Sequence, residues 1–119
     1  MSREREFYLF GRSTYFASRA DQRFPYCLYV PEAATRRALD TGERLPLAVI
    51  VHGTDRAVEL YRETFIPLAD AAGCVLLLPL FPAGIGEPGE LHGYKYLAWG
   101  GVHYDRVLLD MVDEASEQV

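Results

Sequence analysis

A short polar segment that follows an apolar run holds the residues best suited to chemistry. The run Leu47–Val51 leads directly into His52, Gly53, Thr54 and Asp55. Backbone N–H groups in a loop after a strand can stabilise the negatively charged oxygen that develops during acyl transfer. Glycine lets such a backbone approach a substrate carbonyl closely. We therefore expect an oxyanion-binding loop here, whose donor is the N–H of Thr54, or of Asp55 if the loop is wound differently.

His52 is expected to brace this loop rather than to act as a base. The alternative interpretation is that His-Gly after a strand is only a turn. A capped helix and a second apolar strand follow the loop, and this order of elements favours the functional interpretation.

The sequence offers no nucleophile to accompany the loop. It has no Gly-x-Ser-x-Gly elbow, which is the turn that exposes the serine of many hydrolases. No serine has glycines at both flanking positions or lies at an expected strand-to-helix turn; the serines are Ser2, Ser13, Ser18 and Ser116. Cys74 lies in an apolar run, which is the opposite of the accessible, electropositive setting that activates a thiol. We assign no catalytic residue.

Other residues that carry functional groups show no recognisable pattern for a cofactor. His92 and His103 are expected to be exposed loop histidines, and no metal-ligand spacing surrounds them. Gly84-Ile85-Gly86 is not a dinucleotide fingerprint, because no helix begins on it. We predict neither a metal ion nor another cofactor.

The pattern of apolar residues predicts a mixed sheet. Phe7–Phe10 and Arg23–Val30 are expected to pair as an antiparallel hairpin at a sheet edge, joined by a polar segment rich in Ser, Arg and Asp. One face of the second strand carries Phe24, Tyr26, Leu28 and Val30. Leu47–Val51 and Val75–Leu78 are apolar on both faces, which is typical of parallel strands covered on both sides. We expect Leu47–Val51 to be a central strand.

Three helical segments are expected around this sheet. Glu32–Leu39 suits a helical turn or two, and Asp55 can cap a second helix that ends at Gly73. Pro67 predicts that this second helix is interrupted. A third helix spans Tyr104 to about Glu117, with its acids facing outward. The expected inward faces are Val58, Tyr61, Phe65, Leu68 or Ala69, and Ala72 in the second helix, and Val107, Leu108, Met111, Val112 and Ala115 in the third. The connection Leu80–Gly101 is rich in glycine and aromatic residues and is expected to be irregular; these aromatics either line a cleft or pack onto the sheet.

Composition limits the class of protein. The 119 residues fit one domain, and half of them are apolar. The net charge of −5 leaves no basic surface for nucleic acid. The apolar run Cys74–Phe81 is too short to span a bilayer, and the amino terminus lacks a secretory signal, so we expect a cytoplasmic, soluble chain with no disulfide between Cys27 and Cys74.

Four segments together resemble the amino-terminal half of α/β-hydrolases of the polyhydroxybutyrate-depolymerase and feruloyl-esterase type. They are Tyr26–Pro31, Leu45–Thr54, Pro67–Asp70 and Val75–Pro79. The resemblance implies an α/β fold: a partial α/β-hydrolase domain over residues 1–119, with an edge hairpin that leads into a parallel βαβ unit, truncated before the nucleophile strand. It implies a serine esterase that acts on carboxylic esters, and assigns the oxyanion loop to His52, Gly53 and Thr54.

Three hypotheses about function follow. In the first, the chain is the hydrolase part that supplies the oxyanion loop, inactive alone and bound to an ester only in a longer form. In the second, a non-catalytic α/β protein dimerises or binds a partner strand through an exposed sheet edge, expected at Val75–Leu78. In the third, a flavodoxin-like domain holds an anion at the helix N-terminus after the loop, and phosphate would stabilise it.

Overall fold

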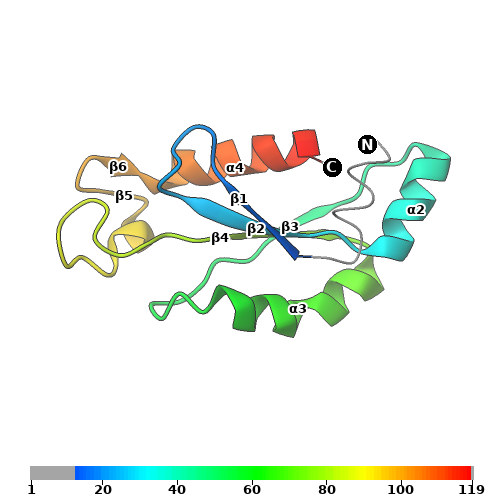
Figure 1. Cartoon of the computed structure of the whole chain (residues 1–119), viewed down its shortest axis with the longest axis horizontal. Helices are drawn as coiled ribbons and strands as arrows, with labels where there is room; N and C mark the ends of the chain where they lie inside the picture. Colours follow the sequence, from blue (N-terminus) through cyan, green and yellow to red (C-terminus); the bar gives the residue numbers. More distant parts are fainter. Residues whose placement is uncertain (1–12, 119) are drawn as a thin grey trace.

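The computed structural model describes residues 13–118. Within this range the chain forms a mixed four-stranded sheet with a helix on each face and a third helix at one end (Figure 1). The sheet order is β1-β2-β4-β3. The strands are β1 (Ser13–Ala17), β2 (Pro25–Tyr29), β3 (Leu47–Val49) and β4 (Val75–Pro79). The helices are α2 (Glu32–Thr41), α3 (Val58–Ala72) and α4 (Tyr104–Gln118). The protein is thus a small α/β domain.

An antiparallel hairpin opens the sheet, as expected, but its first strand comes from a different segment. β1 lies within the segment that the sequence pattern presents as a polar connection, and it pairs with β2. The ring of Phe16 stacks on Tyr26, with 5.6 Å between the ring centroids. Thr, Tyr and Phe favour strands, and they outweigh the polar residues on either side. Phe7–Phe10, the expected partner, lies outside the described residues.

Within residues 13–118 the interior strands of the sheet are β2 and β4, and β3 lies at an edge, so the prediction that Leu47–Val51 is central is wrong. β4 pairs antiparallel with β2 and parallel with β3, whose three residues are only half buried. The prediction of an unpaired edge at Val75–Leu78 is wrong for the same reason. Within residues 13–118 the open edge belongs to β3. Both runs are apolar on both faces, and this pattern does not reveal which of two neighbouring strands lies inside.

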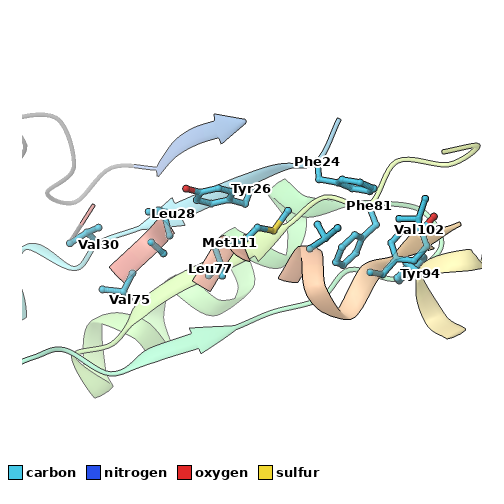
Figure 2. Close-up of a cluster of buried hydrophobic side chains, with 13 residues drawn as sticks. Phe24, Tyr26, Leu28, Val30, Val75, Leu77, Phe81, Tyr94, Val102 and Met111 are labelled. Carbon is cyan, nitrogen blue, oxygen red and sulfur yellow. The ribbon is translucent and has the colours of Figure 1, made fainter. Parts of the chain in front are cut away.

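Alternate residues of β4 face two separate cores. Leu77 lies on the α4 side with Tyr26 and Met111, and all three are fully buried (Figure 2). Leu76 and Leu78 lie on the α3 side with Ala69. The expected face of Arg23–Val30 is confirmed, because Phe24, Tyr26, Leu28 and Val30 all belong to the α4 core. The expected face of α4 is confirmed as well: Val107, Met111 and Ala115 are buried in that core, and Leu108 and Val112 pack against it.

The helix α3 differs from its prediction at both its start and its middle. Ala57, not Asp55, is its N-cap, and no side chain caps the helix. The helix continues through Pro67 without a break. Pro67 and Glu63, whose carbonyl loses its helical partner, are both exposed, so water can satisfy that carbonyl. Ala69 is buried whereas Leu68 and Ala72 are exposed, so the inward face is narrower than predicted. Gly73 ends the helix in the left-handed conformation, as predicted.

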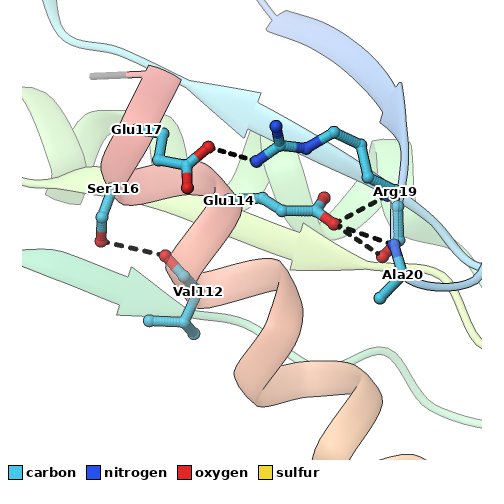
Figure 3. A network of polar contacts seen from close by, with 7 residues as sticks. Arg19, Ala20, Val112, Glu114, Ser116 and Glu117 are labelled. Carbon is cyan, nitrogen blue, oxygen red and sulfur yellow. Dashed lines mark hydrogen bonds and ion pairs between the residues drawn. The ribbon is translucent and has the colours of Figure 1, made fainter.

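One acidic side chain of α4 points inward, against the prediction that all its acids face solvent. Glu114 is 6% exposed, and its Oε1 accepts hydrogen bonds from Ser18 Oγ at 3.1 Å, Arg19 N at 2.7 Å and Ala20 N at 3.2 Å. Figure 3 shows this carboxylate against the turn that follows β1, with Arg19 also reaching Glu117. The carboxylate thus fastens the hairpin turn to α4.

The remaining helix and the long connection also depart from simple expectations. α2 runs to Thr41, longer than the expected turn or two, and ends at Gly42 in the left-handed conformation. The connection after β4 is irregular as predicted, apart from the short helix η1 (Gly93–Tyr96) and a small hairpin of β5 (Ala98–Trp99) and β6 (Val102–His103). No helix within residues 13–118 is both long and apolar enough to cross a bilayer.

Candidate functional site

The loop that joins β3 to α3 lies at the carboxyl end of the parallel pair β3 and β4. Ile50 N continues the ladder by donating to Leu77 O at 2.9 Å, after which the chain leaves the sheet. In open α/β sheets, ligands bind at this end of the strands. The fold therefore places residues 52–55 at the end of the sheet where open α/β sheets normally bind ligands.

His52 is buried beneath the loop and bonds through both ring nitrogens. Its Nδ1 lies 2.8 Å from Gly53 O, and its Nε2 accepts the N–H of Phe81 at 2.9 Å. An acceptor at Nε2 carries no proton, so the proton of the neutral ring is on Nδ1 and is donated to Gly53 O. Burial lowers the pKa of His52 most, and the nearby charges of Arg56 and Lys95 lower it further; together these effects outweigh the hydrogen bond to Gly53 O, which raises it. His52 therefore holds the loop onto the start of the long connection, just after β4, as a neutral side chain.

Arg56 is a second brace, and the sequence pattern did not single it out. Its guanidinium donates to Thr54 O at 2.7 Å, Phe81 O at 2.9 Å and Leu91 O at 2.6 Å. The same group lies over the ring of Tyr94, with 5.0 Å from Cζ to the ring centroid. One side chain thus joins the loop to two points of the long connection, Phe81 just after β4 and Leu91 further along.

Aromatic rings form the floor of the loop. The ring of His52 makes edge contacts with Phe81 and Tyr94, and these two rings stack on each other at 5.5 Å. Tyr94 also donates its hydroxyl to His52 O at 3.2 Å. Burial raises the pKa of this phenol, so it remains a donor at neutral pH. The aromatics of the long connection nearest the loop therefore pack onto the sheet, one of the two roles expected for them.

Three successive carbonyls of the loop accept hydrogen bonds from neighbouring protein groups. His52 O accepts from Tyr94, Gly53 O accepts from the His52 ring and from Arg56 N, and Thr54 O accepts from the Arg56 guanidinium. In a trans peptide the N–H points opposite to the carbonyl. The N–H groups of Gly53, Thr54 and Asp55 therefore point away from these donors, and none of the three has an acceptor within residues 13–118. The loop thus presents consecutive free donors.

The surroundings of these donors are polar and cationic. Lys95 Nζ donates to Thr54 Oγ1 at 2.6 Å and lies 3.2 Å from His92 Nδ1. Gly53 has little space around its Cα, because an added Cβ would lie 3.3 Å from the Tyr61 hydroxyl. Free N–H groups beside a positive charge suit a ligand oxygen that carries negative charge.

Within the described part of the chain, no serine or cysteine side chain lies at the loop. Ser18 is buried and bonded to Glu114, and Ser116 donates to Val112 O near the end of α4. Cys27 and Cys74 are buried within the sheet core, and no disulfide joins them. Within residues 13–118, no cluster of His, Cys, Asp and Glu side chains could hold a metal ion.

A hollow of about 320 Å³ lies at the opposite end of β3 and β4, between α2 and α4, and does not reach the loop.

Of the residues that shape the loop, the sequence indicated His52 and Gly53 but not Arg56, Phe81 and Tyr94. Arg56 adopts φ +51°, a conformation uncommon outside glycine, and nothing in its sequence neighbourhood signals this.

Comparisons with models of known protein families, with curated proteins and with solved structures found no match for this chain.

Proposed function

We propose that the chain is the amino-terminal part of an α/β-hydrolase of the serine-esterase type and supplies half of its oxyanion hole. The site consists of His52, Gly53, Thr54 and Asp55, and the substrate is a carboxylic ester. The observation that carries the proposal is the braced loop after β3, whose free N–H groups lie at the carboxyl end of a parallel strand pair.

The position of this loop matches the division of labour in that fold. One oxyanion donor comes from the loop after the third strand, and the other comes from the residue after the nucleophile. The sequence contains no Gly-x-Ser-x-Gly, so the proposal places the nucleophile on further polypeptide. A parallel strand added to the open edge of β3 would end beside residues 52–55. The nucleophile turn at the end of that strand would then face the free N–H groups.

A second candidate function rests on the same open edge. β3 pairs only with β4 within residues 13–118, and Val51 just beyond it is 44% exposed. An unpaired edge with apolar side chains accepts a strand from another chain. In this alternative the protein dimerises or binds a partner strand without catalysis. Sedimentation equilibrium of the chain alone detects the self-association that the alternative requires for a dimer.

Removing individual loop N–H groups tests the proposal. The chain is co-expressed with a polypeptide that carries the Gly-x-Ser-x-Gly half of an esterase of this type, and turnover of 4-nitrophenyl butyrate is measured. Thr54→Pro and Asp55→Pro each delete one N–H. We expect whichever variant removes the oxyanion donor to lower kcat about 100- to 1,000-fold.

The chain without its complement provides the control. It should hydrolyse the ester no faster than its Gly53→Pro variant, because it lacks a nucleophile. Turnover by the chain alone well above that variant would show that the missing nucleophile is present after all. A complemented enzyme that is indifferent to both prolines would refute the oxyanion assignment.

A further inference from the structure

Arg56 stands out because its backbone conformation and its side-chain bonds are unusual together. Its φ of +51° disfavours any residue with a Cβ relative to glycine. An arginine at this position is therefore explained by its guanidinium rather than by its backbone. That group donates to three backbone carbonyls from two segments: Thr54 O in the loop itself, and Phe81 O and Leu91 O in the long connection, of which Phe81 lies just after β4.

One of these bonds fixes the direction of a single peptide unit. The bond from Arg56 Nη1 to Thr54 O is 2.7 Å long and holds the Thr54 carbonyl toward the protein. The same peptide unit contains the N–H of Asp55, which therefore points the opposite way. Thr54 N–H is set differently, because the preceding carbonyl, Gly53 O, is held by His52 Nδ1 and by the backbone N–H of Arg56. The two candidate donors thus depend on different braces.

We propose that Arg56 is the positioning residue that orients the Asp55 N–H as an oxyanion donor and couples it to the long connection. The inference rests on the proposed function of the loop. The guanidinium is planar and matches several carbonyls at fixed angles, which an ammonium group does not. Its bonds to Phe81 O and Leu91 O hold the group in place while it bonds Thr54 O. Displacement of the long connection would therefore release the Asp55 N–H.

Two variants separate the guanidinium from the backbone conformation. Arg56→Gly keeps the left-handed φ without strain but removes all three bonds, and Arg56→Lys keeps the charge but not the planar group. Arg37→Lys, on an exposed turn of α2, is the matched control. The readout is the carbonyl ¹³C chemical shift of Thr54, Phe81 and Leu91 in the isolated chain, which does not depend on catalysis.

We expect the three carbonyl resonances to shift together in Arg56→Lys and Arg56→Gly, and to stay at their wild-type positions in Arg37→Lys. Methylguanidinium at tens of millimolar should return them toward wild type in Arg56→Gly only. Three resonances unmoved in Arg56→Lys would overturn the inference. A merely structural role would not produce rescue that is confined to these three carbonyls.

The complemented enzyme then distinguishes this inference from the proposed function. If Asp55→Pro and Arg56→Lys both lower kcat with little change in KM, both stand. If Thr54→Pro lowers kcat but Asp55→Pro and Arg56→Lys do not, the oxyanion loop stands and the role of Arg56 falls. If the carbonyl resonances move but neither proline variant affects turnover, the oxyanion assignment itself falls, and with it the positioning role.

Discussion

Replacing His52 with alanine is expected to lower the free energy of unfolding by about 3 kcal/mol. The change leaves the N–H of Phe81 without its acceptor in a buried position. It also removes the ring that packs edge-on against Phe81 and Tyr94, and the cavity adds to the cost. Urea denaturation followed by circular dichroism measures the loss.

Two further variants show whether the effect comes from the bond that His52 makes. His52→Gln offers an amide oxygen that can accept the N–H of Phe81, so it should lose roughly half as much stability as His52→Ala. His103 is exposed at the end of the short hairpin, and His103→Ala should change stability by less than about 0.5 kcal/mol. Equal losses in His52→Ala and His103→Ala would contradict the bracing role of His52.

Replacing Glu114 with alanine is expected to lower the free energy of unfolding by about 3 kcal/mol. The carboxylate is the acceptor for the hydroxyl of Ser18 and for the backbone N–H groups of Arg19 and Ala20. Its removal leaves these donors unpaired where the hairpin turn meets α4. Urea denaturation measures the loss, and faster hydrogen exchange at the amides of Arg19 and Ala20 locates it.

Neighbouring substitutions act as controls for Glu114. Glu114→Gln keeps an acceptor oxygen and loses only the charge, so it should cost about 1 kcal/mol. Glu117 lies one turn away, is exposed, and pairs with Arg19 at the surface. Because surface ion pairs contribute little, Glu117→Ala should leave the denaturation midpoint unchanged. A Glu114→Ala variant as stable as Glu117→Ala would show that the buried carboxylate does not fasten the turn.

Alternation and helical periodicity were enough to predict the faces of the two main core elements. Phe24, Tyr26, Leu28 and Val30 alternate with residues of opposite orientation, and this pattern survives in the structure. The buried face of α4 could likewise be predicted, from the spacing of its apolar residues. The exception, Glu114, was missed because its partners are two backbone N–H groups and a hydroxyl more than 90 residues earlier in the chain, and no local pattern encodes such a partner.

The order of the strands in the sheet could not be predicted from the sequence, for a physical reason. Leu47–Val49 and Val75–Pro79 are both apolar throughout, but the second pairs on both sides and the first on one. Which strand lies inside depends on the antiparallel pairing of β2 with β4, which is a long-range contact. β1 was missed because Ser13 and the polar residues after Ala17 hide a short run of strand-forming residues.

At the candidate site, too, one part could be predicted from the sequence and another could not. The order of strand, His-Gly loop and helix was enough to locate residues 52–55 at the end of a strand. The braces were not predictable, because Arg56 reaches Phe81 and Leu91, which lie 25 and 35 residues away in the chain. Tyr94 likewise reaches His52 from the long connection. Local patterns reveal where a loop begins, whereas its conformation is set by contacts that only the fold creates.

Labelling of the native protein shows whether this loop serves a serine hydrolase. An extract of the source cells is treated with a fluorophosphonate, which reacts with the activated serine of such enzymes, and is precipitated with an antibody against the α4 segment. We expect the precipitate to contain a labelled serine, either in a longer polypeptide that the antibody recognises or in a chain bound to it. A precipitate that contains the protein but no labelled serine would show that the loop does not serve a serine hydrolase.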